Sequence, residues 1–180
     1  LRPDHHGIIQ NTMHDSVLGD FKLSNETAVG DGRWWGGEPV WVSVEKAGLH
    51  SATLFWPGSQ AAIDGVRPSQ YRVYDKSVSA GARVDAVAAW LDEPAATRPA
   101  FVTLYFDEVD EAEHEHAPGS PEALAAIHET DTAIGHLVDI LRARGQLDRI
   151  NIVLVSDHGF AKVPKGQVVI VEDVVSKEEA

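Results

Sequence analysis

Two short motifs that combine carboxylates with imidazoles follow apolar runs in this chain. The residues are Asp110 and His114 after the run at 100–106, and Asp157 and His158 after the run at 150–155. Carboxylate oxygens and imidazole nitrogens are ligands that zinc and similar divalent ions take in proteins. Two strands that each end in Asp and His predict a metal site, and paired ions about 3.5 to 4 Å apart serve phosphoryl transfer.

Each motif also has an ordinary structural interpretation. Ser156 or Asp157 could cap a helix and leave His158 as a loop residue. The acidic run at 107–115 could be a solvated face, since that is where most acidic runs lie. The repetition of the pattern at two strand ends favours the metal site over both interpretations.

Two other histidines bear on the ligand assignment. His116 lies two residues from His114 and is an alternative ligand at that position. His128 lies within the longest predicted helix, where a solvated side chain is the usual outcome, and we expect no catalytic role for it.

The elements that must position these side chains alternate between strand and helix. Strands are predicted at 52–55, 100–106, 150–155 and 168–171, and helices at 38–47, 84–91 and 120–145. The pattern predicts an α/β fold with a mainly parallel sheet and helices on both faces. Ligands gather beyond the carboxyl ends of such strands. Residues 1–37 are rich in Gly, Asp and Asn, and we expect an irregular segment near a substrate cleft.

At this point the chain resembles a known family, the nucleotide pyrophosphatase/phosphodiesterases of the alkaline phosphatase superfamily, with its bacterial members as the nearest likeness. The resemblance implies an alkaline phosphatase-like α/β/α sandwich. The segments that carry it, in order, are Leu1-Arg2-Pro3-Asp4-His5-His6-Gly7-Ile8, Asn11-Thr12-Met13, Arg33-Trp34-Trp35-Gly36-Gly37-Glu38-Pro39, Phe55-Trp56-Pro57-Gly58, Tyr105-Phe106, Asp110 with His114, and Ser156-Asp157-His158-Gly159.

The resemblance implies a role for each candidate site residue. Two zinc ions are implied, one held by Asp110 and His114 and the other by Asp157 and His158. Asn11 resembles the amide that donates to a phosphate oxygen, a device that stabilises charge in the transition state. The substrate-binding candidates are Tyr105, which resembles the aromatic that stacks on the nucleobase, and Tyr74, which would line the same pocket.

The resemblance also implies groups that the chain does not contain. An Asp and a Thr nucleophile precede the segment that resembles Leu1, and a third His ligand follows Ser156-Asp157-His158-Gly159 in the family. Residues 1–180 are therefore expected to form the central part of one phosphodiesterase catalytic domain. The implied mechanism is in-line displacement through a nucleotidyl-Thr intermediate.

Two positions depart from the family pattern. Glu113 and Ala117 stand where the family usually has Gly. If the first Gly takes a positive φ, Glu113 would strain the turn by about 1 kcal/mol or more. Strain there would disturb the geometry of the first metal site.

Composition limits the classes of partner. The chain has 180 residues, 43% of them hydrophobic, and a formal net charge of −13. No basic footprint for a nucleic-acid polymer is present. The chain has no cysteine, and no run approaches the length of a membrane span. A periplasmic or secreted location is implied by the resemblance alone.

The expected activity is metal-dependent hydrolysis of nucleotide phosphodiester or pyrophosphate bonds, with release of nucleoside 5′-monophosphates. The expected partner is a nucleotide or another small phosphodiester. One alternative is a superfamily hydrolase for phosphonates, phosphomonoesters or sulfate esters, which would not need the stacking aromatic. Another alternative is an inert metal-binding fragment.

Overall fold

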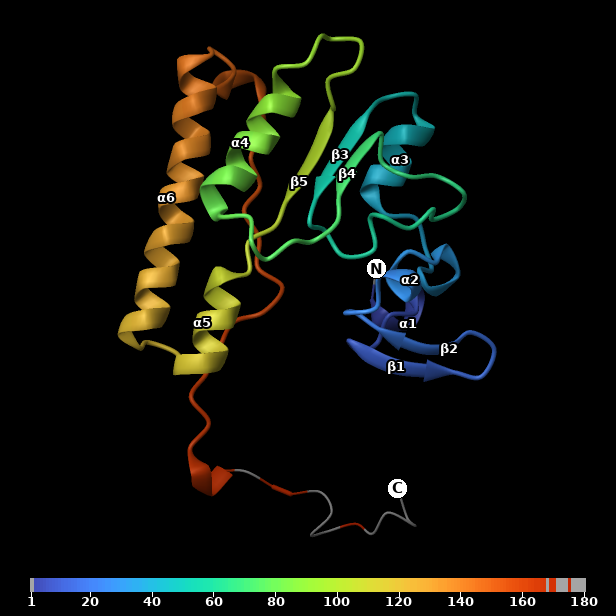
Figure 1. Ribbon diagram of the computed structural model, residues 1–180, viewed down its shortest axis with the longest axis vertical. Coiled ribbons are helices and arrows are strands. Elements are labelled where there is room, and N and C mark those ends of the chain that lie inside the picture. The colour runs from blue at the N-terminus through green and yellow to red at the C-terminus, as the bar shows by residue number, and fades with distance from the viewer. Residues whose placement is uncertain (1, 168, 171–174, 176–180) are drawn as a thin grey trace.

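The computed structural model describes residues 2–167, 169–170 and 175. Its centre is a parallel sheet of three strands in the order β4-β3-β5, with helices on both faces (Figure 1). The α/β class predicted from the sequence is thus confirmed. The strands are β3 (Ser51–Leu54), β4 (Gln70–Arg72) and β5 (Phe101–Leu104).

The sheet is held together by the burial of its central strand. Every residue of β3 is buried, and its register pairs Thr53 with Thr103 on β5 and with Tyr71 on β4. Successive side chains of a strand point to opposite faces, so Ala52 and Leu54 enter the core shared with helix α4. The same strand is thus covered on both sides, as parallel sheets require.

The helices on the first face are α4 (Ala80–Leu91) and α6 (Pro121–Ala143). In α4 the hydroxyl of Ser79 caps the helix start by accepting from the Ala82 amide, and Ser120 caps α6 in the same way. The predicted helix at 120–145 is confirmed, and Gly145 with φ 65° follows its end. On the other face lies α3 (Val40–Lys46), within the helix predicted at 38–47.

Residues 2–37 are more regular than expected. They contain α1 (Pro3–His6), the antiparallel hairpin of β1 (Thr12–Asp15) and β2 (Gly19–Lys22), α2 (Glu26–Val29) and a 3-10 turn at Gly32–Trp34. Their small core is formed by Phe21, Ala28, Val29 and Trp34. The expectation of an irregular segment was wrong. Each hairpin strand has only four residues, and Phe21 is the one aromatic side chain that they bury, so the sequence shows little alternation of apolar and polar residues.

The strand predicted at 150–155 is wrong. The segment has no strand pairing within the described part of the chain, and the side chains of Val153, Leu154 and Val155 are 79%, 75% and 69% exposed. Apolar, β-branched composition shows that a segment is able to form a strand, but pairing also needs a neighbouring backbone edge. The strand predicted at 168–171 begins and ends on residues outside the described ones.

The last elements complete the path to the site. Helix α5 (Glu108–His116) follows β5 directly, and short 3-10 turns lie at Leu147–Arg149 and Lys165–Gln167. Figure 1 shows α5 beyond the end of β5, at the same end of the sheet as the β1–β2 hairpin. Among the described residues, no helix has the length and apolar character needed to cross a membrane.

Candidate active site

Helix α5 brings two predicted metal ligands together. Asp110 and His114 are four residues apart on this helix, so they lie on the same face. The distance between Asp110 Oδ1 and His114 Nε2 is 3.6 Å. The helix starts immediately after β5, and this connection places both side chains beyond the carboxyl end of the sheet.

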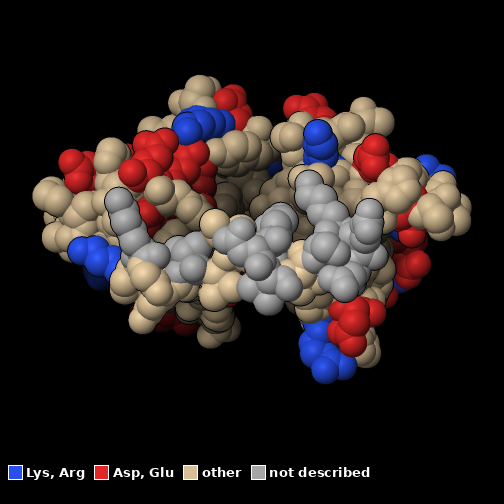
Figure 2. Space-filling view, turned by 90° about the horizontal axis from the view of Figure 1, so that it is seen from below, with Lys and Arg blue, Asp and Glu red and all other residues tan. Residues whose placement is uncertain are grey.

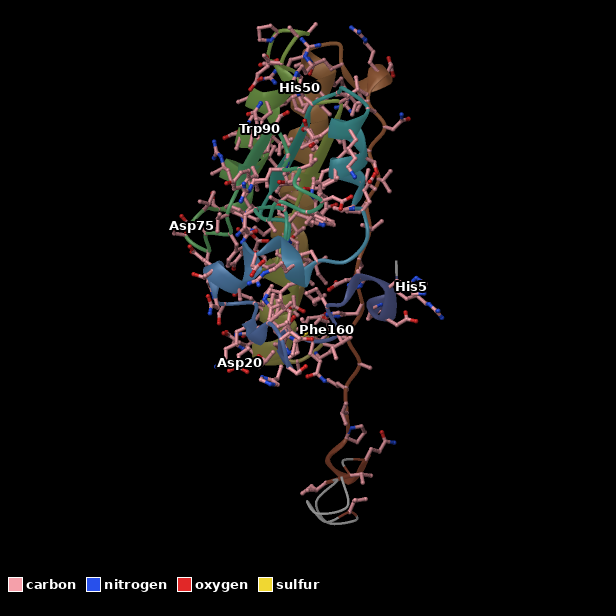
Figure 3. All side chains as sticks on the ribbon, turned by 90° about the vertical axis from the view of Figure 1, so that its right-hand side faces the viewer. His5, Asp20, His50, Asp75, Trp90 and Phe160 are labelled. Atoms are coloured by element: carbon pink, nitrogen blue, oxygen red, sulfur yellow. The ribbon has the colours of Figure 1, made fainter. Side chains whose placement is uncertain are left out.

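The segment after residue 155 returns to the same place although it forms no strand. His158 Nε2 lies 3.8 Å from Asp110 Oδ1 and 3.4 Å from Asp157 Oδ2. Phe160 stands edge-on to both imidazoles, with ring centroids 4.8 Å from His114 and 5.4 Å from His158. Figure 3 labels Phe160 at the α5 end of the molecule, far along its long axis from Trp90 of α4.

The carboxylate and imidazole donors are of the types that bind a small divalent ion, and their spacing suits such an ion in part. Two ligands at tetrahedral positions around zinc, with bonds of about 2.0 to 2.1 Å, lie roughly 3.4 Å apart. The three distances above are near that value. Among the described residues, however, no group of three or more His, Cys, Asp or Glu is arranged to hold a metal ion. The spacing thus suits pairs of donors, and the assignment of these four side chains as metal ligands stays a prediction.

Both predicted substrate-binding tyrosines line one hollow. It has a volume of about 310 Å³, and Asp110 of the metal-ligand set also lines it. Its aromatic walls include Phe55, Trp56, Tyr74 and Tyr105. Small-molecule sites are typically apolar clefts of this size or larger with a few polar groups. The hollow can hold a planar ring next to the Asp-His cluster.

Asn11 lies in an adjoining hollow that is wider and more open, about 570 Å³. Leu23, Ser24 and Tyr74 line both spaces, which are therefore neighbours. Figure 2 shows the molecule hollowed near the centre of the face seen from below, with acidic side chains on both sides. The segment at 2–37, which was expected near a cleft, lies beside one, and Thr12 and Lys22 of its hairpin form part of the wall.

A buried ion pair that sequence reasoning missed underlies the tyrosine pocket. Arg83 on α4 and Asp107 are both buried, and Arg83 Nη1 donates to Asp107 Oδ1 at 2.7 Å. The other carboxylate oxygen of Asp107 accepts a hydrogen bond from the Tyr74 hydroxyl. The acidic run made Asp107 look solvated. The signal that could have found it is its place between the end of β5 at Leu104 and the start of α5 at Glu108.

These contacts shift the pKa values of both partners. Burial raises the pKa of Asp107, but hydrogen bonds from Tyr74 and Arg83 outweigh burial and hold this pKa below its usual value. Burial and the Asp107 carboxylate raise the pKa of Tyr74. Tyr74 is therefore a neutral hydrogen-bond donor to an ionised carboxylate across the physiological pH range.

The strain expected at Glu113 is absent from that position. Glu113 lies inside α5, whereas Ala117, which ends the helix, has φ 71° and ψ 154°. That region of backbone space is used almost only by glycine. The expectation was wrong because α5 continues through His116. The unusual backbone conformation therefore falls at Ala117, the second position where the family usually has Gly.

Sequence comparison places these features in a known family. The model of the type I phosphodiesterase / nucleotide pyrophosphatase family matches residues 1–180. A venom phosphodiesterase of Macrovipera lebetinus is 40% identical over 178 residues, which are 98% of this chain and 21% of that protein. Ectonucleotide pyrophosphatase/phosphodiesterase family member 3 of Bos taurus is 39% identical over 161 residues, 89% of this chain and 18% of that protein.

Structural comparison agrees with the sequence match. An inactive variant of murine ectonucleotide pyrophosphatase/phosphodiesterase 5 in complex with AMP has a TM-score of 0.87 and 29% identity, and the match covers 99% of this chain and 47% of that one. The chain thus spans about a fifth of the length of the curated relatives and about half of the solved one. With the whole chain matched in sequence and nearly all of it in fold, this chain belongs to the type I phosphodiesterase / nucleotide pyrophosphatase family.

Proposed function

We propose that the protein containing this chain hydrolyses nucleotide phosphodiester or pyrophosphate bonds and releases nucleoside 5′-monophosphates. The observation that carries the proposal is the contact between two features. An aromatic hollow of about 310 Å³ with Tyr74 and Tyr105 in its walls is also lined by Asp110, a member of the Asp-His cluster. A nucleobase in the hollow would bring its 5′-phosphate toward the cluster.

The residues of this chain take separate roles in the proposal. Tyr105 and Tyr74 bind the base, and the Asn11 amide donates to a non-bridging phosphate oxygen from the neighbouring hollow. Asp110, His114, Asp157 and His158 are the proposed ligands of two zinc ions, and His116 remains an alternative to His114. Bound zinc would stabilise charge on the phosphate and activate a hydroxyl or water.

The remaining groups are proposed to come from elsewhere in the same domain. Residues 1–180 would form the central part of a catalytic domain whose Thr nucleophile and further metal ligands lie outside them. The match of the whole chain to about a fifth of the length of a curated relative supports this division.

The proposal is tested with the full-length protein and three chromogenic substrates. It should cleave p-nitrophenyl thymidine 5′-phosphate and bis(p-nitrophenyl) phosphate much faster than p-nitrophenyl phosphate. A preference for the monoester, or for a sulfate ester, would instead identify one of the other superfamily hydrolases. The aromatic hollow favours the nucleotide substrate, since a phosphomonoesterase has no need of a base-binding wall.

A further inference from the structure

The Asp107 carboxylate is directed away from the helix that it precedes. Asp107 is the N-cap residue of α5, yet its side chain makes no capping hydrogen bond. A cap carboxylate would ordinarily accept from the first free amides of the helix. Here its two oxygens are used by Arg83 and by Tyr74.

Arg83 is held on several sides at once. Its Nε donates to the Val78 carbonyl at 2.9 Å, and its Nη1 donates to the Tyr105 carbonyl at 3.2 Å as well as to Asp107. Only 2% of its side chain is exposed. The guanidinium therefore has one orientation, and it joins α4 to the end of β5.

Tyr74 is restrained from two directions, and both restraints lead to Arg83. Tyr74 is 44% exposed, so packing alone leaves its ring free on one side. Its hydroxyl reaches Arg83 through Asp107. Its ring stands edge-on to Phe55 at 5.6 Å, and the Arg83 guanidinium carbon lies 5.1 Å from the Phe55 ring centroid. Phe55 itself has φ 60°, a costly conformation that points to a constraint at this site.

Taken together, we propose that Arg83 is a positioning residue that acts through Asp107 on Tyr74, and so sets how the aromatic hollow holds a nucleobase. The inference rests on the proposed nucleotide hydrolysis. Stability alone does not account for the pair, because a buried ion pair contributes little more than apolar side chains of the same volume. An apolar pair, however, could not hold a tyrosine hydroxyl.

The test compares a substrate with a base and a substrate without one. The full-length protein is assayed with p-nitrophenyl thymidine 5′-phosphate and with methyl p-nitrophenyl phosphate, which has nothing to place in the hollow. The quantity measured is the ratio of the two kcat/KM values. In Arg83→Gln and in Tyr74→Phe this ratio should fall about tenfold, mainly through the KM of the nucleotide, since one hydrogen bond to a charged group is lost.

A double variant and a matched control separate positioning from folding. Because both changes break the same chain of contacts, Arg83→Gln combined with Tyr74→Phe should lower the ratio no further than either alone. Arg144→Gln is the control, since Arg144, at the end of α6, also pairs with a carboxylate and donates to a carbonyl, those of Asp92 and Ala88 at the opposite end of α4. Its ratio should equal that of the unmodified protein.

Defined results would overturn the inference. An unchanged ratio in folded Arg83→Gln, or additive losses in the double variant, would show that Arg83 does not act through Tyr74. If Arg83→Gln fails to fold, an unchanged ratio in Tyr74→Phe has the same meaning, because that variant removes one oxygen from a half-exposed side chain. An unmodified protein that shows no preference for the nucleotide would contradict the proposed function instead.

Discussion

Asp110 lies between the two histidines of the proposed metal site, within 3.6 Å of one and 3.8 Å of the other. A carboxylate in that position can serve either ion or both. Asp157 contacts His158 alone among these side chains. The two carboxylates are therefore not equivalent, and their removal should have unequal effects.

In the full-length protein, Asp110→Ala and Asp157→Ala should each lower zinc content and turnover. We expect losses of about 10²-fold or more, because a displaced ion removes several kcal/mol of charge stabilisation from the transition state. Asp110→Ala should lower the zinc content more than Asp157→Ala does. Elemental analysis of the purified variants beside their rates provides the measurement.

His128→Ala is the control for both variants. His128 lies exposed on α6, and its described contact is made by the backbone carbonyl rather than the ring. Its zinc content and rate should be unchanged. The ligand assignment would be wrong if Asp157→Ala kept both ions, or if His128→Ala lost one.

Ala117 offers a test of local strain. At φ 71° and ψ 154° an alanine is held in a region that costs about 1 to 3 kcal/mol for a residue with a Cβ. Ala117→Gly should therefore raise the free energy of unfolding by about 1 kcal/mol, after the greater chain entropy of glycine is subtracted. Urea denaturation measures the change.

Gly119 supplies the reciprocal substitution two residues later. It has φ 78° and open space around the position of a Cβ, so Gly119→Ala tests conformation without a clash. This variant should be destabilised. Loss of stability in Ala117→Gly would show that the backbone at residue 117 is not strained.

Sequence reasoning identified one part of the candidate site and missed another. The structure brings Asp110, His114, Asp157 and His158 near one another, although the run before Asp157 forms no strand, and their role as metal ligands stays a prediction. Arg83 and Asp107 were not found, because their meaning depends on a contact between residues 24 positions apart. Burial of a charge is a property of the fold and leaves little local pattern.

At the scale of elements, Glu45 joins α3 to the sheet. Its Oε1 accepts from the amide and hydroxyl of Ser51, at the start of β3, and from the Ser69 amide, each at 2.7 Å. The Ser69 hydroxyl donates to Oε2 at 2.9 Å. One carboxylate thus fixes the helix, the central strand and the approach to β4.

Glu45 makes the stability of the sheet depend on pH. Burial raises its pKa, but the hydrogen bonds from Ser51 and Ser69 together lower it below the usual value. A lowered folded-state pKa means that the contribution is fully present above about pH 4.3, the unfolded value, and is lost as pH falls through the folded value. Glu45→Gln should be less stable by about 1 to 2 kcal/mol at pH 7, and the difference should shrink in acid.

The comparison is made by urea denaturation at pH 7 and at pH 3. Glu38→Gln serves as the control, because Glu38 also accepts hydrogen bonds but does so on the surface, from Ser43 and Lys46. A Glu45→Gln variant with the same stability as the parent at pH 7 would contradict the assigned role.

The elements found from sequence are those with a strong period of their own. The helix at 120–145 has a serine cap, a first-turn proline and a terminal glycine, and its bounds were nearly correct. Strand β4 was missed because Gln70, Tyr71 and Arg72 are a polar edge strand with little apolar signal. The strand at 150–155 failed for the opposite reason, since its composition is ideal while the described structure offers it no pairing.

For the molecule as a whole, the isolated chain should be inactive. Residues 1–180 alone should hydrolyse phosphodiesters at no more than the background rate, whatever zinc is added, since the proposed mechanism takes its Thr nucleophile and further ligands from outside them. Steady-state assay with p-nitrophenyl thymidine 5′-phosphate measures this. Zinc-dependent turnover by the purified chain would show that the site is complete without other segments.

The exposed run at 152–155 has a practical consequence for handling the chain. Four consecutive apolar residues between 45% and 79% exposed, whose backbone pairs with no strand in the described part of the chain, are a template for pairing with other chains. Such a surface on the isolated chain drives association whenever concentration rises. The net charge of −13 opposes this at low salt and is screened at high salt. Purification in dilute, low-salt buffer would therefore keep the chain in solution longest.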